Sequence, residues 1–157
     1  MAAAIEVGGK LPDVELTVPG GGKINVRDYL GKPLVLYFYP KDDTAGCTRE
    51  AQDFSQHYAD FQAHGAAVLG ISRDTPAKHQ KFIDKYELTV PLASDDQDQA
   101  MAAFGVWVEK KLYGKIYMGI DRSTYLFDAS GTLVRTWRKV RVPGHVEEVL
   151  GALKELG

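Results

Sequence analysis

Cys47 is the only cysteine of this 157-residue chain, and it is the residue best suited to act as a nucleophile. The hydroxyl of Thr44 lies three residues before it, and Pro40 lies four residues earlier still. A single cysteine is more often a small buried hydrophobic residue than a reactive one. Residues 41–44 (KDDT) are polar, however, so this stretch is not typical of a protein core. Cys47 is therefore the first candidate for a reactive group.

The elements expected around Cys47 would place it at the start of a helix. Residues 34–39 (LVLYFY) are apolar on both faces, which is typical of a central strand, and Pro40 ends it. From Cys47 to Phe61, apolar residues recur at helical spacing. Active sites of α/β proteins gather at the carboxyl ends of strands. Free N–H groups and the dipole of a first helical turn also stabilise a thiolate, so this position favours a reactive role.

Two strings around the cysteine resemble the signature of the peroxiredoxins: residues 37–40 (YFYP) and 44–48 (TAGCT). The resemblance extends along almost the whole chain and includes residues 70–72 (GIS), 104–107 (FGVW) and 119–124 (GIDRST). Together they are similar to the subfamily called bacterioferritin co-migratory protein, or Q-type peroxiredoxin. The resemblance implies an antioxidant, thiol-dependent peroxidase that reduces hydrogen peroxide and organic hydroperoxides without a cofactor.

The same resemblance implies a role for each site residue. The Cys47 thiolate would attack the terminal peroxide oxygen and become a sulfenic acid. Thr44 would hold a peroxide oxygen, although it could also be a helix N-cap, and Pro40 would shield the thiolate from water. Arg122 would pair with the thiolate and the polarised peroxide, unless it is a generic surface arginine. The N–H groups of Gly46 and Cys47 would stabilise the departing oxygen, much as an oxyanion hole does.

This chain departs from the pattern at the second cysteine. Many Q-type members place a resolving cysteine five residues after the first, where this chain has Gln52, and others place it in the helix that here contains residues 100–103 (AMAA). No second thiol can condense with the sulfenic acid. We therefore expect a one-cysteine cycle in which an external thiol restores Cys47. Thioredoxin, glutaredoxin with glutathione, or another small thiol would fill that role.

Other interpretations of Cys47 remain open at this point. A Cys–His hydrolase needs a nearby histidine, but His57 lies ten residues along the same helix, which leaves only His145. Thiol–disulfide exchange of the thioredoxin sort would need a second cysteine where Glu50 stands. A redox-sensing binding protein would use Cys47 stoichiometrically, without turnover. A glutathione peroxidase is the nearest enzyme by chemistry, but the residues before Cys47 favour a peroxiredoxin.

The remaining patterns predict one α/β domain over residues 1–157. We expect a thioredoxin-like three-layer sandwich, with a central mixed sheet and helices on both faces. Segment 106–119 shows no clear pattern. The expected strands are residues 14–18, 34–39, 66–71 and 90–93 and the hairpin 123–127 with 132–137, and the expected helices begin near Cys47 and cover 76–86, 98–104 and 145–156.

Composition and charge narrow the classes of partner. The 45% hydrophobic and 25% charged residues are typical of a soluble globular protein. A net charge of -2 gives no electrostatic reason to expect nucleic acid or a membrane as a partner. The first ten residues do not resemble a secretory signal, and a lone cysteine suits a reducing compartment, so we expect the cytoplasm. The resemblance to Q-type peroxiredoxins, which are often monomeric, implies a monomer.

Two further groups of residues carry weaker expectations. The four histidines (His57, His64, His79 and His145) show no metal-ligand spacing, so we expect solvated side chains and no metal. The basic residues Arg135, Arg138, Lys139 and Arg141 are expected to form a solvated face, with docking of a thiol reductase as the alternative.

Overall fold

The computed structural model describes residues 4–156, so residues 1–3 and 157 of the expected domain lie outside the described part. One seven-stranded sheet has the order β2-β1-β5-β4-β3-β8-β9, and β6 and β7 form a separate two-stranded sheet. The strands are β1 (Glu15–Thr17), β2 (Lys23–Asn25), β3 (Leu34–Phe38), β4 (Ala67–Ser72), β5 (Leu92–Ser94), β6 (Trp107–Leu112), β7 (Lys115–Ile120), β8 (Ser123–Phe127) and β9 (Leu133–Trp137). The helices are α1 (Ala45–Ala63), α2 (Pro76–Tyr86), α3 (Gln99–Phe104) and α4 (His145–Glu155), with a 3-10 turn, η1 (Val26–Tyr29).

The central strand β3 divides the hydrophobic core into two halves. It pairs in parallel with β4 and antiparallel with β8, so no edge of it is free. Its side chains alternate in direction: Val35 and Tyr37 pack into the core beneath α1 and α4, whereas Leu36 and Phe38 pack into the other half. Every residue of β3 is buried, as its double-sided apolar pattern predicts.

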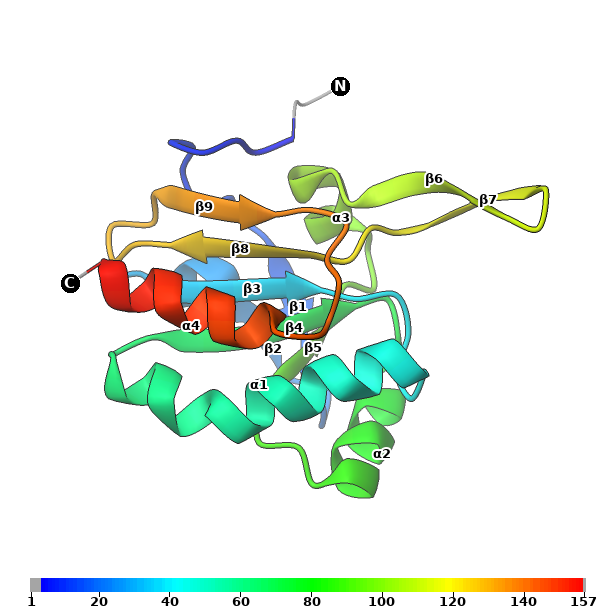
Figure 1. The fold of residues 1–157 in the computed structure, drawn as a ribbon, viewed down its shortest axis with the longest axis horizontal. Helices are drawn as coiled ribbons and strands as arrows, with labels where there is room; N and C mark the ends of the chain where they lie inside the picture. The colour runs from blue at the N-terminus through cyan, green and yellow to red at the C-terminus, as the bar shows by residue number, and fades with distance from the viewer. Residues whose placement is uncertain (1–3, 157) are drawn as a thin grey trace.

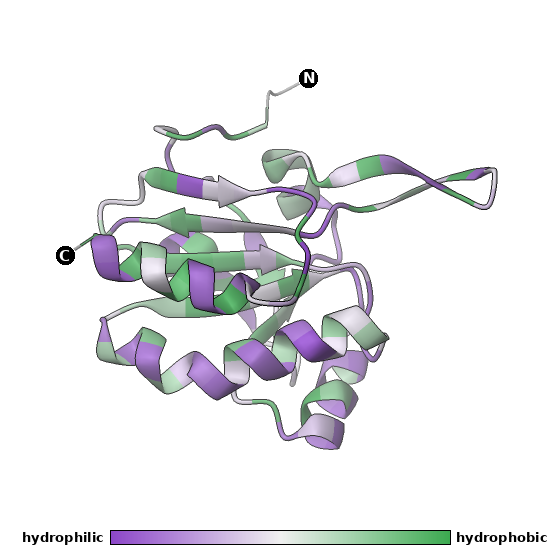
Figure 2. Ribbon diagram, viewed as in Figure 1, coloured by the Kyte–Doolittle hydropathy of each residue, from purple (hydrophilic) through white to green (hydrophobic). Residues whose placement is uncertain are grey.

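Helices cover both faces of the sheet, which confirms the thioredoxin-like three-layer sandwich. Helices α1 and α4 lie side by side on one face, and α2 packs against the same half of the core (Figure 1). Helix α3 and η1 contribute to the opposite half. Figure 2 shows the hydrophobic colouring concentrated on the central strands and mixed with hydrophilic residues along the helices. Within residues 4–156, no helix is long and apolar enough to cross a membrane.

Residues 106–119, which showed no clear pattern in the sequence, lie almost entirely in an antiparallel hairpin formed by β6 and β7. Its strands, WVEKKL and KIYMGI, show no regular alternation of apolar and charged residues and no consistently buried face, and most of their positions are exposed. Such a ribbon lacks the hydrophobic period that marks a half-buried strand. The short elements β2 and η1 were also absent from the expectation.

Candidate active site

The start of α1 places Cys47 at the carboxyl end of β3. Thr44 occupies the N-cap position in an extended conformation, and Cys47 is the third residue of the helix. First-turn N–H groups have no partner within the helix, so they and the helix dipole favour a negative charge at this position. The Cys47 side chain is 2% exposed and packs with Tyr37, Ala51 and Phe54 in the core.

The Arg122 guanidinium links Cys47 to a buried carboxylate. Its Nη2 donates to Cys47 Sγ at 3.2 Å, and its Nη1 donates to Glu50 Oε1 at 2.6 Å. Arg122 lies in the short connection between β7 and β8, so the sheet brings together residues that are 75 positions apart. Because the two prongs of the guanidinium are occupied, its orientation toward the sulfur is defined.

Gly46 makes room for this guanidinium. An ideal Cβ at residue 46 would lie 3.2 Å from Arg122 Nη2, which is closer than side chains ordinarily approach. The helix at this point does not require glycine for its backbone, since Gly46 is not among the residues with positive φ. The close approach of Arg122 therefore explains the glycine.

Burial and charge set the electrostatics of the pair. Burial raises the pKa of Glu50 to about 7, although Arg122 acts to lower it. Burial disfavours the charged guanidinium, but Glu50 and Cys47 outweigh that effect and the pKa of Arg122 is raised. Burial, and next the charge of Glu50, raises the pKa of Tyr37 well above its ordinary value. Sequence reasoning did not single out Glu50, although a charged residue on the apolar stripe of a helix was the available signal.

Thr44 and Pro40 precede Cys47 in the sequence and have different surroundings in the structure. The Thr44 hydroxyl donates to the Lys41 carbonyl oxygen at 2.8 Å, and it makes no side-chain capping bond within the described residues. Pro40 follows the end of β3 and lines a surface depression together with Trp107 and Tyr117. The structure thus joins Cys47, Gly46 and Arg122 by direct contact and leaves Thr44 bonded to its own loop.

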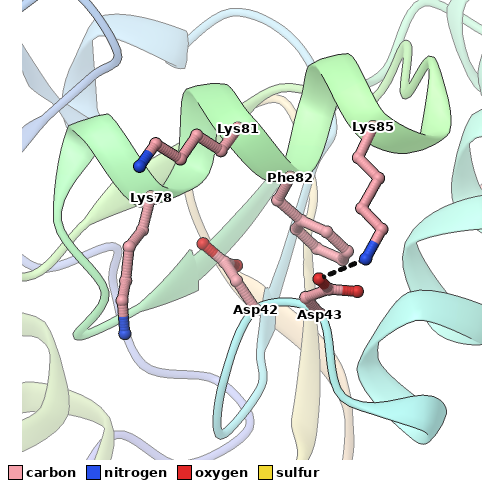
Figure 3. Close-up of a pocket in the computed structure, with 6 residues that line it drawn as sticks. All are labelled: Asp42, Asp43, Lys78, Lys81, Phe82 and Lys85. Atoms are coloured by element: carbon pink, nitrogen blue, oxygen red, sulfur yellow. Dashed lines mark hydrogen bonds and ion pairs between the residues drawn. The ribbon is translucent and has the colours of Figure 1, made fainter.

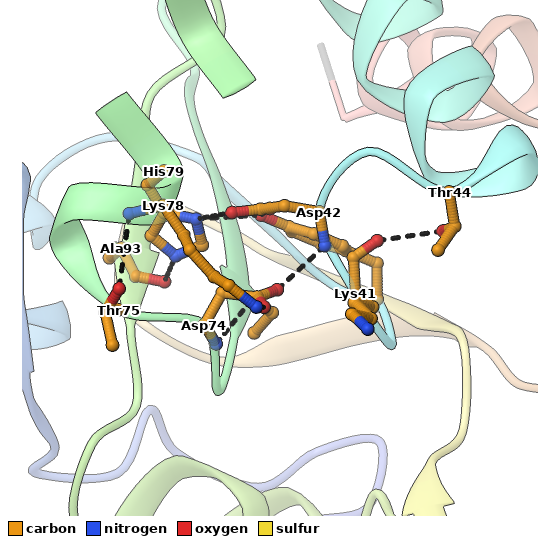
Figure 4. Close-up of polar contacts among 10 residues, drawn as sticks. Lys41, Asp42, Thr44, Asp74, Thr75, Lys78, His79 and Ala93 are labelled. Atoms are coloured by element: carbon orange, nitrogen blue, oxygen red, sulfur yellow. Dashed lines mark hydrogen bonds and ion pairs between the residues drawn. The ribbon is translucent and has the colours of Figure 1, made fainter. Parts of the chain in front are cut away.

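A buried polar network fixes the loop before α1. His79 Nε2 faces the Ala93 carbonyl at 3.0 Å, so this nitrogen must carry a hydrogen, and Nδ1 lies 2.6 Å from Asp42 Oδ2. His79 therefore holds one oxygen of Asp42, whose other oxygen accepts from the Tyr39 hydroxyl. The N–H of Asp42 also donates to Asp74 at 2.8 Å (Figure 4). These contacts attach the loop that leads into α1 to α2.

The expectation of solvated histidines is wrong for His79 and His145. Both are buried, because each has a hydrogen-bond partner that replaces water. His145 Nε2 lies 2.8 Å from Thr124 Oγ1, and burial lowers the pKa of His145 to about 4. Its hydrogen bond to Thr124 gives no support to a Cys–His hydrolase. Within residues 4–156, no three His, Cys, Asp or Glu side chains are grouped to hold a metal ion.

Other surface features lie outside the cysteine cluster. A cavity of about 320 Å³ lies between α2 and the loop before α1, and acidic and basic side chains line it around Phe82 (Figure 3). One of these side chains, Lys85, pairs with Asp43 at 2.8 Å. In the basic run near the last strand, Arg135 pairs with Glu148 and Arg138 pairs with Asp121. Two of its four cations are therefore engaged within the chain.

Comparison with known proteins gives one consistent family. The model of the AhpC/TSA family matches residues 7–136. "Peroxiredoxin Bcp" of Bacillus subtilis is 48% identical over 152 residues, covering 97% of this chain and 97% of that protein.

Solved structures agree with the sequence comparison. A cysteine-to-serine mutant of PrxQ from Xylella fastidiosa superposes with a TM-score of 0.92 at 39% identity, covering 98% of each chain. A structure concerned with alkyl peroxide reduction by the Xanthomonas campestris bacterioferritin comigratory protein has a TM-score of 0.88 at 42% identity, covering 96% of this chain and 98% of that one. Serine mutants at two different cysteines of the Xanthomonas protein are also among the similar structures.

Proposed function

This chain belongs to the AhpC/TSA family and is a thiol-dependent peroxidase of the peroxiredoxin type, and we propose that Cys47 is the residue that peroxide oxidises. The observation that carries this assignment is the contact of Arg122 Nη2 with Cys47 Sγ at 3.2 Å. A permanent cation beside a first-turn cysteine stabilises the thiolate, which is the nucleophilic form. A stoichiometric redox sensor is not favoured, since the relatives are peroxiredoxins.

In the proposed chemical step, the thiolate attacks the terminal oxygen of the hydroperoxide. An S–O bond forms as the O–O bond breaks, sulfur is oxidised to the sulfenic acid, and the alkoxide or hydroxide leaves with a proton as alcohol or water. Arg122 and the N–H groups of Gly46 and Cys47 stabilise the charge that develops on the departing oxygen.

Thr44 and Pro40 are proposed to shape the substrate position. The Thr44 hydroxyl already uses its hydrogen toward Lys41, so its oxygen remains able to accept a hydrogen bond from the peroxide. The half-buried ring of Pro40 stands at the depression beside the loop and would limit access of water. Hydrogen peroxide and organic hydroperoxides are the proposed substrates.

The lone cysteine supports a one-cysteine cycle. An external thiol attacks the sulfenic sulfur, water leaves, and a second thiol then releases Cys47 from the mixed disulfide. Thioredoxin or glutaredoxin with glutathione would serve. The cycle is wrong if peroxide converts the reduced protein to an intersubunit Cys47 disulfide that turns over as the main intermediate. Because the sulfenic acid waits for an outside thiol, excess peroxide without reductant should inactivate the enzyme through sulfinic acid.

The proposed cellular compartment follows from the single cysteine, Cys47. A free cysteine persists in a reducing compartment, so we place the protein in the cytoplasm. We also propose, from the resemblance to Q-type peroxiredoxins, that it acts as a monomer and without metal or other cofactor. The net charge of -2 is the basis for expecting no nucleic acid or membrane as partner.

The experiment that tests the assignment is trapping of the sulfenic acid. One equivalent of hydrogen peroxide followed by dimedone should add one dimedone to the wild-type protein, and intact-mass measurement should find none on Cys47→Ser. Equal labelling of the two proteins, or an unchanged Cys47 thiol after peroxide, would contradict it.

A further inference from the structure

The hairpin of β6 and β7 projects from the body of the molecule (Figure 1). Nine large hydrophobic residues are exposed within residues 4–156, and six of them lie on this hairpin: Trp107, Leu112, Tyr113, Ile116, Tyr117 and Met118. Scattered exposed hydrophobics are ordinary, but a concentration on one element marks an interaction surface. A two-stranded ribbon is also marginally stable alone in water, so contact with a partner would stabilise it.

The tip of the hairpin carries a residue that its turn does not require. Tyr113 and Gly114 have φ values of 51° and 78° and form the two-residue connection between the strands. Such turns favour Asn-Gly, because both residues adopt positive φ. A tyrosine is disfavoured in this conformation, and its side chain is 96% exposed. Neither turn geometry nor packing within the chain accounts for the ring.

The charge of the hairpin indicates the kind of surface that would complement it. Lys110, Lys111 and Lys115 lie on the strands with a single acidic residue, Glu109, in a chain whose net charge is -2. An apolar surface with a concentration of lysines is complementary to an apolar surface with an acidic rim.

The base of the hairpin is continuous with the candidate active site. A depression of about 360 Å³ is lined by Trp107, Lys110 and Tyr117 on the hairpin and by Pro40 and Lys41 on the loop before Cys47. The stem of Lys110 lies over Gly119, where an ideal Cβ would be 3.3 Å from its Cδ. A molecule seated along the hairpin would therefore reach the loop that leads into α1, the helix that carries Cys47.

We propose that the β6–β7 hairpin is the docking surface for a thioredoxin-type dithiol protein that reduces oxidised Cys47. The proposal rests on the function proposed above, since a chain with one cysteine needs an outside thiol. One partner thiol attacks the Cys47 sulfenic sulfur, an S–S bond forms and the S–O bond breaks with loss of water. The second partner thiol then attacks the mixed disulfide, so Cys47 leaves as thiolate and the partner keeps the disulfide and has lost two electrons.

The test compares two reductants on the same enzyme: thioredoxin with thioredoxin reductase and NADPH, and dithiothreitol. The hairpin variant combines Tyr113→Asn, which suits the turn better, with Ile116→Ser. Its matched control is Val7→Ser, at another exposed apolar residue. The ratio of thioredoxin-driven to dithiothreitol-driven kcat/KM should fall about tenfold in the hairpin variant, as expected for loss of an interface anchor, and remain constant in the control.

A charge variant provides an independent measurement. Lys115→Glu should lower the thioredoxin kcat/KM and weaken its dependence on ionic strength, whereas Lys32→Glu, at an exposed position away from the hairpin, should do neither.

Several results would overturn the docking proposal without touching the proposed function. The first is an equal ratio of thioredoxin-driven to dithiothreitol-driven kcat/KM in the hairpin variant and in the control. The second is turnover with glutathione alone that is as fast as with thioredoxin, or no turnover with thioredoxin at all. The third is a dimer in sedimentation that the wild type forms and the hairpin variant does not. Failure of the proposed function is different, because dithiothreitol would then support no turnover by the wild type.

Discussion

Replacing Gly46 with alanine should slow peroxide reduction while leaving the fold as stable as before. The new Cβ would lie 3.2 Å from Arg122 Nη2 and 3.8 Å from its Cζ, so the guanidinium must move by a few tenths of an ångström. Its other prong is held 2.6 Å from Glu50, so the movement lengthens the bond to Cys47. The substitution therefore perturbs one contact without changing any charge.

The magnitude follows from the strength of that contact. A hydrogen bond involving a charged group contributes about 1.5–3 kcal/mol. Loss of roughly half of it, about 1 kcal/mol, would slow oxidation of Cys47 about fivefold. Alanine is favoured over glycine within helices by up to about 1 kcal/mol, so the free energy of unfolding should be unchanged or slightly higher.

Stopped-flow oxidation by hydrogen peroxide and urea unfolding measure the two effects separately. The matched control is Gly151→Ala in α4, where a Cβ would meet nothing within 4 Å, and it should leave the oxidation rate unchanged. If Gly46→Ala is folded and oxidises as fast as the wild type, or if both variants slow equally, the reasoning about Arg122 is refuted.

Other substitutions test the rest of the cluster. Arg122→Lys should slow oxidation by about 100-fold, because one ammonium cannot hold the fork geometry toward Glu50 and Cys47; a stopped-flow rate within about threefold of wild type would contradict this. Because the folded pKa of Glu50 is raised to about 7, its contribution to stability is complete below about pH 4.5 and is lost, by up to about 3 kcal/mol, as the pH rises to 7. Urea unfolding of Glu50→Gln should lack this fall, and an identical pH slope would refute it. The pKa of His145 is lowered to about 4, so its contribution to the stability of the fold is present above about pH 6.5 and is lost as the pH falls toward 4. His145→Gln should therefore lose less thermal stability between pH 6.5 and pH 4 than the wild type does. An equal loss in the two proteins counts against the assignment. His79→Ala should lower the free energy of unfolding by about 3 kcal/mol or more, since a buried carboxylate loses its partner, whereas a change below about 1 kcal/mol in urea unfolding would show that the network contributes little.

The local part of the site could be predicted because its residues are adjacent in the sequence. Pro40, Thr44 and Cys47 fall between one predicted strand and one predicted helix, so their proximity follows from that connection alone. Arg122 is 75 residues away, and only the family resemblance paired it with Cys47. No periodicity reveals that two distant side chains meet across a sheet.

Glu50 and His79 show what the pattern of polar residues concealed. Each lies on the inner face of a helix, near apolar residues that were assigned to the core. From the sequence, His79 was nevertheless expected to face solvent, and no role was assigned to Glu50. Burial of a charged side chain depends on a partner supplied by another element, here Arg122 and Asp42. The β6–β7 hairpin was missed for a different reason, since a ribbon exposed on both faces has no hydrophobic period.

The central claim is that Cys47 performs catalytic turnover with an external thiol. The most direct measurement is continuous peroxide consumption with dithiothreitol by the wild type and by Cys47→Ser under identical conditions. We predict many turnovers for the wild type and none above background for the serine variant. Equal consumption by both proteins, or a single equivalent consumed by the wild type in excess dithiothreitol, would contradict the account.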